Sequence, residues 1–418
     1  MKNGYNTGIK VLVSGLIVAG VSAAVCDYKF YGAFVDSFFA FTVLSFVILY
    51  LRVSPKGSTV LTICSLGLVF AAIEFGILHY PAKPMVWISL FGLSAFTALP
   101  IHALWATGEK RKTLFLAFFP LLPFVVLGFF MPFILDWFSM VHPKTLDLYL
   151  LSFDSSLRVQ LSFLFGQAFA RSLFLAFSGW AFYMALPIPI ALVYAGQLLK
   201  AREKAFEAIT AFLIVGPIAM VFYYFFPAAG PRNLFGAGFP FHVFPLVAAP
   251  RLLLEPVATP GLRNAMPSVH LTCALLAWWY SRKLSLAERA VTFIFLVYTV
   301  FAVLGTGEHW FVDLIVACPF CIFLRGLCMR GDVISGRRIE AVGVGLGGTL
   351  AWLAVLRFAP KFFWISPIIP WVLVAGTIAL TIVQNHKLYS ASKAPVAQGS
   401  AIGNVAVREG VESLSTAG

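Results

Sequence analysis

The chain has 418 residues, of which 60% are hydrophobic and 11% are charged, and its mean hydropathy is +0.91. This composition excludes a soluble globular protein of this length and predicts an integral membrane protein. The net charge of +13 resides mainly in loops between apolar stretches, which indicates a membrane topology and no nucleic-acid partner.

Apolar stretches long enough to be candidate membrane helices follow one another along the whole chain. They cover residues 11–26, 34–51, 59–79, 85–106, 114–132, 177–198, 206–226, 267–281, 289–306, 309–327, 341–357 and 364–384. Because several are short or broken, we predict an all-α polytopic transmembrane bundle of 10–12 spans. Residues 1–25, with Lys2 and Lys10 ahead of an apolar run, also allow a cleaved signal peptide.

The stretches divide the chain into four regions. These are an N-terminal transmembrane block of about four spans (1–113), a six-span catalytic core (114–330), two C-terminal spans (331–388) and a disordered tail (389–418).

Two segments of the core are expected to lie outside the membrane. Residues 133–176 are too polar at their start to span, which favours an interfacial helix. Residues 227–266 are rich in Pro and Gly and suit a loop that covers a site.

The distribution of basic residues predicts the orientation of the chain. About 20 of the 30 Lys and Arg fall on the side of the N-terminus, which the positive-inside rule assigns to the cytoplasm. Both termini are then cytoplasmic, and the opposite face is periplasmic in a bacterium or lumenal in a eukaryote.

Two segments place ionisable residues in otherwise apolar sequence, where such residues usually serve chemistry or transport. They are Met-Pro-Ser-Val-His at 266–270 and Gly-Glu-His-Trp-Phe-Val-Asp at 307–313. The residues between them allow one short crossing, a hinge at 281–283 and one crossing back. His270 and His309 therefore return to the same outer face, where we expect them to meet.

The spacing of the second segment predicts an activated histidine. His309 and Asp313 are four residues apart and lie on one face of a helix. The carboxylate can accept the proton of one imidazole nitrogen and leave the lone pair of the other nitrogen free for attack.

The first segment predicts a site for an anion. His270 follows Pro267-Ser268, a typical helix start, and the positive end of that helix favours a phosphate. Arg232 and Arg263 precede His270 on the outer loop, and guanidinium groups suit phosphate oxygens.

Other interpretations use the same residues. His270, His309 and Asp313 could bind zinc, but no supporting ligand spacing accompanies them, so we expect no metal. A transporter or flippase of an anionic amphiphile could use the His-Asp pair as a proton relay. Such proteins often carry paired repeats, and none is found in the sequence.

The combination of Pro-Ser-Val-His, a second histidine at 309 with Asp313, and outer arginines resembles the type 2 phosphatidic acid phosphatase superfamily. Within this superfamily, the sequences Pro-Ser-Val-His at 267–270 and His-Trp-Phe-Val-Asp-Leu at 309–314 resemble those of one branch. This branch contains the aureobasidin-resistance proteins, the inositol phosphorylceramide synthases. The resemblance covers roughly 114–327. Hydrolases of the superfamily carry Ser-Arg where this chain has Ala302 and Val303, which favours the phosphotransferase branch.

The resemblance implies a lipid phosphotransferase or phosphatase that needs no metal or cofactor. His309, oriented by Asp313, would attack phosphorus to form a phosphohistidine, and His270 would protonate the leaving alkoxide. An acceptor hydroxyl from water, a polyol or a lipid would then take the group. The phosphate-binding residues would be Arg232, Arg263 and Ser268, which act on a lipid phosphate at the outer face of the membrane.

Overall fold

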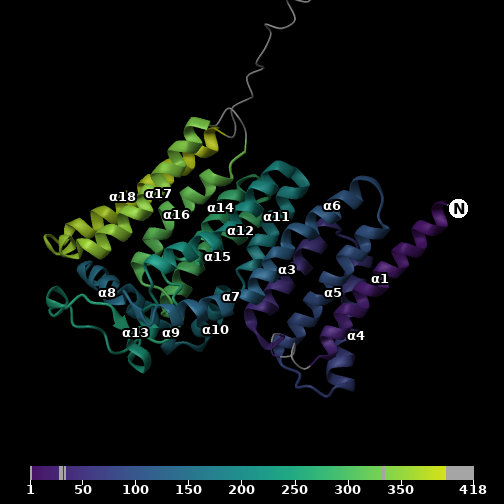
Figure 1. The fold of residues 1–418 in the computed structure, drawn as a ribbon, viewed down its shortest axis with the longest axis horizontal. Coiled ribbons are helices and arrows are strands. Elements are labelled where there is room, and N and C mark those ends of the chain that lie inside the picture. Colours follow the sequence, from purple (N-terminus) through teal and green to yellow (C-terminus); the bar gives the residue numbers. More distant parts are fainter. Residues whose placement is uncertain (1, 28–31, 33, 331–334, 392–418) are drawn as a thin grey trace, which may run out of the picture.

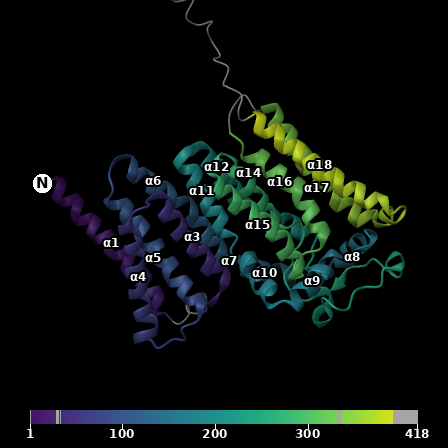
Figure 2. The ribbon, with the colours of Figure 1, turned by 180° about the vertical axis from the view of Figure 1, so that it is seen from behind.

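A computed structural model describes residues 2–27, 32, 34–330 and 335–391 of the chain. These residues form an all-α bundle, as predicted, in which the long helices run between two ends of the molecule (Figure 1). The short helices α8, α9 and α13 lie at one end, and α6 lies at the other (Figure 1), as the view from behind also shows for α8, α9 and α6 (Figure 2). Several long apolar helices identify the chain as a multi-pass integral membrane protein.

The first half of the chain contains α1 (Lys2–Cys26), α3 (Ser37–Val53), α4 (Gly57–Ala71) with its π-helical continuation η1 (Ala72–Ile77), α5 (Pro84–Trp105), α6 (Gly108–Phe118), η2 (Phe119–Leu121), α7 (Leu122–Val141), β1 (Lys144–Thr145), α8 (Asp147–Ser156), α9 (Leu161–Arg171) and α10 (Leu173–Met184). The second half contains α11 (Pro187–Lys200), α12 (Arg202–Phe225), α13 (Pro231–Phe235), η3 (Gly236–Gly238), η4 (Ala249–Arg251), β2 (Val257–Ala258), α14 (Val269–Tyr280), η5 (Ser281–Lys283), α15 (Leu286–Gly305), α16 (Phe311–Cys328), α17 (Ser335–Phe358), η7 (Pro360–Trp364) and α18 (Ile368–Ala391).

Fewer helices than predicted are long and apolar enough to cross a membrane. Among the described residues there are eight, namely α1, α4 with η1, α5, α12, α15, α16, α17 and α18. A ninth is counted if α9 and α10, which are bent by 118°, form one broken span. The stretch predicted at 177–198 is divided at Pro187, and α14 has only 12 residues. Proline breaks and short helices thus account for the difference between this number of long apolar helices and the 10–12 predicted stretches.

The first outer segment begins later than predicted. The helix α7 continues to Val141, past the predicted boundary at residue 133, because Asp136 is exposed on its surface and does not end it. The segment then holds α8, α9 and the strand β1. This strand pairs antiparallel with β2 of the second outer segment, so that Thr145 lies opposite Val257. The two outer segments are therefore joined to each other.

The N-terminal block has its own apolar core and packs sideways on the rest. Val25, Phe70 and Leu90 belong to a cluster within this block. A second cluster joins α3, α5 and α6 to α11 and α12. An ion pair of 3.0 Å between Arg52 and Glu288 connects α3 to the start of α15.

The largest apolar cluster surrounds α16, whose span is 83% buried inside the protein. The helix α14 runs beside it, and the Cys321 thiol approaches the Thr272 carbonyl at 3.7 Å. Both helices start at the same end, where the amide of Ser268 donates to the Asp313 carbonyl at 3.3 Å. The predicted hinge at 281–283 is a 3-10 turn, η5.

The helices α17 and α18 pack against α16. The tail was predicted from residue 389, but α18 continues to Ala391. Residues 392–418 lie outside the described part of the chain.

The orientation yields a labelling prediction. In a protein with the exposed Cys26 and Cys64 changed to Ser, a cysteine at Val247, which is 89% exposed in the second outer segment, should react with an impermeant thiol reagent in intact cells. A cysteine at the exposed Lys110 should react only after permeabilisation. The reverse pattern would overturn the orientation, and the parent without either cysteine is the control.

Candidate active site

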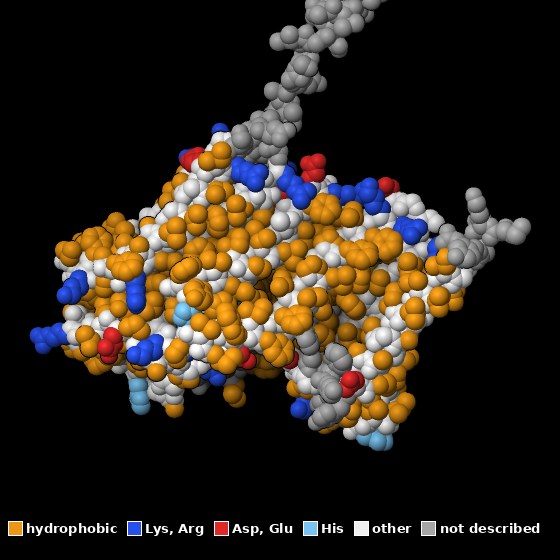
Figure 3. Space-filling model, in the orientation of Figure 1, with side chains coloured by type: hydrophobic (Ala, Val, Ile, Leu, Met, Phe, Trp, Pro, Cys, Tyr) orange, Lys and Arg blue, Asp and Glu red, His pale blue; other side chains and the backbone are white. Residues whose placement is uncertain are grey.

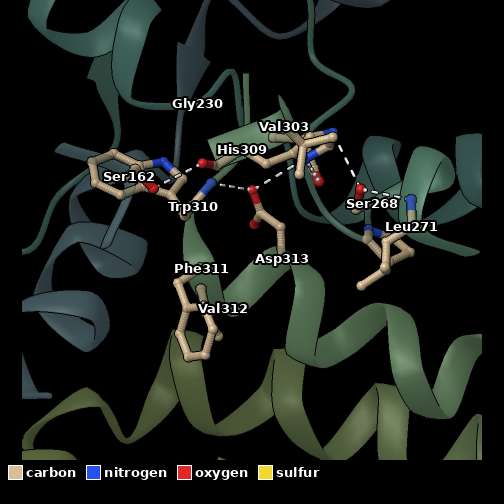
Figure 4. A network of polar contacts seen from close by, with 12 residues as sticks. Ser162, Gly230, Ser268, Leu271, Val303, His309, Trp310, Phe311, Val312 and Asp313 are labelled. Atoms are coloured by element: carbon tan, nitrogen blue, oxygen red, sulfur yellow. Dashed lines mark hydrogen bonds and ion pairs between the residues drawn. The ribbon is translucent and has the colours of Figure 1, made fainter. Parts of the chain in front are cut away.

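His309 lies in the turn between α15 and α16 and is buried, with 2% of its surface exposed. Its backbone is fixed on both sides: its amide donates to the Val303 carbonyl at 3.2 Å, and its carbonyl accepts from the Ser162 hydroxyl at 3.0 Å (Figure 4). The helix α16 begins two residues later and holds Asp313 in its first turn. The position of the imidazole is therefore set by three separate elements.

The two ring nitrogens of His309 have different surroundings. Its Nδ1 is 2.9 Å from the Ala265 carbonyl oxygen and 3.4 Å from Oδ2 of Asp313. Because both neighbours are acceptors, we place the proton on Nδ1, and Nε2 then carries the lone pair. Asp313 lies where the sequence predicted, but the Ala265 carbonyl makes the shorter contact. The Asp313 carboxylate also accepts from the Trp310 amide at 2.7 Å.

The start of α14 lies opposite this free nitrogen. Ser268 caps the helix by accepting from the Leu271 amide at 3.4 Å, and its hydroxyl is 3.3 Å from Nε2 of His309. The ring centroids of His270 and His309 are 6.2 Å apart. His270 also stacks on Tyr183 of α10 at 3.8 Å. The fold thus brings Ser268 and both histidines together, as the two motifs predict.

Burial controls the charge of His309, which lies outside the spans that flank it. It lowers the pKa of this imidazole to about 4, although Glu308 and the Ala265 carbonyl act in the opposite direction. The ring is therefore neutral near pH 7. The unfolded chain binds this proton at its ordinary pKa of about 6.5. Folding stability from this group is accordingly lost as the pH falls from there toward 4.

Two buried acids of α8, neither identified as a site residue from the sequence, hold the loops around His309. The Asp147 carboxylate accepts from the amides of Ala229 and Gly230 at 3.0 and 2.9 Å and from the Trp310 indole at 2.7 Å. The loop before Arg232 and the turn after His309 are thereby joined. The spacing of Asp147 and Asp154, seven residues apart, places them on one helix face, but it does not indicate which loops they bind.

Asp154 binds the start of α16. Its two oxygens accept from the amides of Phe311 and Val312 at 2.8 and 3.2 Å. Burial raises the pKa of Asp154 to about 8, the neighbouring Asp313 adds to the rise, and the two amide bonds oppose it. This carboxyl group supplies partners for two of the amides that a helix start leaves unpaired.

Arg232 lies next to the His309 turn, at the start of α13. Its amide donates to the Gly307 carbonyl at 2.9 Å, and its Nη1 is 3.4 Å from a Glu308 oxygen. The side chain is 64% exposed, so its guanidinium can reach an incoming group. Gly230 makes this contact possible, because its φ is +86° and a Cβ atom there would overlap the Glu308 carbonyl.

The structure gives Arg263 a different position from the one expected of a phosphate ligand. The residue is buried, and all five of its N–H donors face backbone carbonyls. These carbonyls belong to His142, Pro143, Thr259, Pro260 and Gly261. No donor is left for a substrate. The guanidinium instead ties the second outer segment to the end of α7, which the sequence did not reveal.

Residues 148–325 match the family model of the PAP2 superfamily. This match supports the type 2 phosphatidic acid phosphatase superfamily. It includes α8 from its second residue and both histidine motifs. It supports a membrane protein of the phosphatase and phosphotransferase type, consistent with a lipid phosphate substrate. No curated protein and no solved structure matches the chain significantly.

Among the described residues, no group of three or more His, Cys, Asp and Glu is placed to hold a metal ion.

The close contact between Gly230 and the Glu308 carbonyl predicts the effect of replacing this glycine with alanine. Gly230 and Gly236 both have positive φ, but a Cβ atom at Gly236 would meet nothing within 4 Å. Gly236→Ala should cost about 1–2 kcal/mol of stability through its backbone conformation alone. Gly230→Ala should cost about 1–3 kcal/mol more, because the loop must move away from Glu308. Thermal unfolding of the two variants in detergent measures this difference, and equal midpoints would contradict the proposed contact.

Proposed function

We propose that the protein is a metal-independent lipid phosphotransferase or lipid phosphatase that works through a phosphohistidine at His309. The observation that carries this proposal is the unprotonated Nε2 of a neutral, buried His309. This nitrogen faces the start of α14, where the Ser268 hydroxyl is 3.3 Å away, and the neighbouring His270. A nucleophile needs an available lone pair and a fixed orientation. The contacts of Nδ1 with Ala265 and Asp313 support both.

The reaction would proceed in two displacements. In the first, Nε2 of His309 forms a bond to phosphorus while the bond from phosphorus to the leaving oxygen breaks. His270 in its protonated form gives that oxygen a proton. In the second, an acceptor hydroxyl loses its proton to His270 and attacks phosphorus, and the phosphorus–nitrogen bond breaks. Both histidines then return to their original states.

Two helices, α14 and α16, start at the site, and only the start of α14 is available to an anion. The start of α16 already faces the carboxyl groups of Asp154 and Asp313. The start of α14 is capped by the neutral hydroxyl of Ser268, which leaves its positive dipole available. A phosphate placed between His309 and this start would gain from the dipole and from the Ser268 hydroxyl. We therefore assign Ser268 to the substrate phosphate.

Arg232 is the cation best placed to support the same group. It adjoins the His309 turn, and Glu308 is its partner before substrate arrives. A phosphate would compete with that carboxylate for the guanidinium. Since Arg263 has no donor to spare, Arg232 is the only arginine that this proposal assigns to the phosphate, together with Ser268.

Transfer to a hydroxyl acceptor is favoured over simple hydrolysis. Ala302 and Val303 are fully buried and apolar at the positions where hydrolases of the superfamily carry Ser-Arg. The acceptor would be a polyol or lipid hydroxyl, as in inositol phosphorylceramide synthases. The two histidine motifs of this chain resemble the corresponding sequence motifs of those enzymes. The active site would face the periplasm or lumen, in line with the distribution of basic residues.

The first prediction from this mechanism concerns the nucleophile. His309→Ala should abolish turnover and labelling of the protein by lipids that carry radioactive phosphate. Asp313→Asn should retain a small activity, roughly 10²-fold or more below wild type, because the nitrogen remains but its orientation and tautomer change. His242→Ala, which removes an exposed outer-loop histidine, is the matched control.

Three outcomes of this experiment would count against the mechanism. Normal turnover in His309→Ala would reject the nucleophile, and trapped phosphate on His270 would reverse the two roles. Movement of an anionic amphiphile across the bilayer without any turnover would favour the transporter interpretation instead.

A second prediction separates the two arginines. Arg232→Lys keeps the charge but loses the planar fork, so turnover should fall at least roughly tenfold while the thermal midpoint is unchanged. Arg263→Lys leaves three donors for five carbonyls and should lower the thermal midpoint. Turnover and thermal unfolding are measured on both variants. A loss of stability in Arg232→Lys, with normal turnover per folded molecule, would assign it a structural role.

A further inference from the structure

A second polar site lies at the end of the bundle opposite to the histidines. A small pocket with a cavity volume of about 30 Å³ is bounded by α11, α12, α14, α16 and α18. Tyr280 and Arg325 line it near the ends of α14 and α16, whereas His270 and Asp313 lie near the starts of these helices. Twelve residues of helix separate Asp313 from Arg325, which is about 18 Å. The pocket is thus separate from the catalytic site.

Arg325 is a buried cation without a counter-ion. Only 5% of its surface is exposed, and no carboxylate of the described residues forms an ion pair with it. Its Nε has no hydrogen-bond partner, and Nη1 makes one long contact of 3.5 Å with the Asn385 carbonyl. The rings of Trp279 and Tyr280 lie 5.6 and 5.7 Å from it. An unpaired buried charge is costly, so this arrangement favours an anionic ligand.

Two further buried atoms in the same pocket lack partners. They are the hydroxyl of Tyr280 and Oε1 of Gln197, and both residues line the pocket with Arg325. The amide nitrogen of Gln197 already donates to the Tyr280 carbonyl, which fixes the orientation of the side chain. The pocket therefore offers a hydroxyl donor, a guanidinium donor and an amide acceptor. A phosphate ester with a free hydroxyl group can satisfy all three.

The rim of the pocket adds positive charge. Arg282, Lys283 and Lys204 line it, and Arg282 stacks on Tyr389 at 4.9 Å. The acid that lines it, Glu207, already accepts from Lys204 at 2.8 and 2.9 Å. Lys and Arg side chains gather along this edge of the molecule (Figure 3). The positive charge of the rim is therefore not neutralised by the pocket itself.

We propose that this pocket binds a phosphate-bearing anion, either the headgroup of an anionic lipid or a soluble phosphate compound. Basic pockets between transmembrane helices on the cytoplasmic side are suited to anionic headgroups. The orientation predicted from the loops places this end in the cytoplasm. Neither a histidine nor an acidic pair lines the pocket, so its role is binding and not catalysis. It does not depend on the function proposed for His309.

Tyr280→Phe is the sharpest test, because it removes one unpartnered hydroxyl and leaves the ring beside Arg325. Full-length protein is placed in nanodiscs of phosphatidylcholine, with inorganic phosphate added, or in nanodiscs that also contain phosphatidic acid. Binding raises the thermal midpoint with increasing ligand. Tyr280→Phe should keep the ligand-free midpoint and weaken binding about tenfold, as expected for a hydrogen bond to a charged group.

A pair of double variants tests the rim. Arg282→Gln with Lys283→Gln should also weaken binding at least about tenfold. Lys110→Gln with Lys112→Gln removes the same charge from exposed positions of α6 outside the pocket and should leave binding unchanged. Phosphate that binds at the catalytic site contributes equally to all these variants, so the difference between them reports the pocket.

The outcomes separate the two sources of the anion. Stabilisation by inorganic phosphate in phosphatidylcholine indicates a soluble compound, and stabilisation by phosphatidic acid alone indicates a lipid headgroup. Equal shifts in wild type, Tyr280→Phe and both double variants would show non-specific attraction and overturn the proposal. So would a Tyr280→Phe protein that loses ligand-free stability but binds normally.

Discussion

The arrangement of the end that contains His309 depends on buried carboxyl groups that bind backbone amides. Asp147 joins the loop at 229–230 to Trp310, and Asp154 holds the first amides of α16. Together with Asp313, they fill the interior beneath His309 with carboxyl groups bound to backbone amides, while the buried guanidinium of Arg263 is enclosed by carbonyls. These groups leave neither an amide nor a guanidinium donor for a phosphate in the interior. In the proposed mechanism, the start of α14 and Arg232 are the groups that attract it.

Features encoded by neighbouring residues were predictable from the sequence. Pro267 and Ser268 indicate the start of α14, and Ser268 caps it. The lengths of the apolar runs on either side of the hinge return His309 to the level of His270, and the structure places their rings 6.2 Å apart. The all-α class follows from composition alone. The match to the PAP2 superfamily over 148–325 agrees with the same motifs.

Features that depend on distant residues were not predictable. Arg263 was a reasonable phosphate ligand by residue type, but its acceptors include carbonyls about 120 positions earlier in the chain. Asp147 interacts with residue 310, and a single sequence does not indicate such a pairing. The structure contains fewer long apolar helices among its described residues than the 10–12 predicted stretches, because apolar runs do not show where proline divides them, as at Pro187. Long-range hydrogen bonds and helix breaks thus set the limit of the prediction.

The two ends of α14 require different chemistry to attract the same kind of group. At its start, the helix dipole is positive, so a neutral cap at Ser268 is sufficient to favour phosphate near His270. At its end, the dipole is negative and repels an anion. A phosphate site there needs full positive charges, and Arg325, Arg282 and Lys283 are present in the pocket. Arg325 also lies in the last turn of α16, where a cation is favoured by that helix dipole. This dipole offsets only part of the cost of burying the unpaired charge, and the Nε of Arg325 remains without a hydrogen-bond partner.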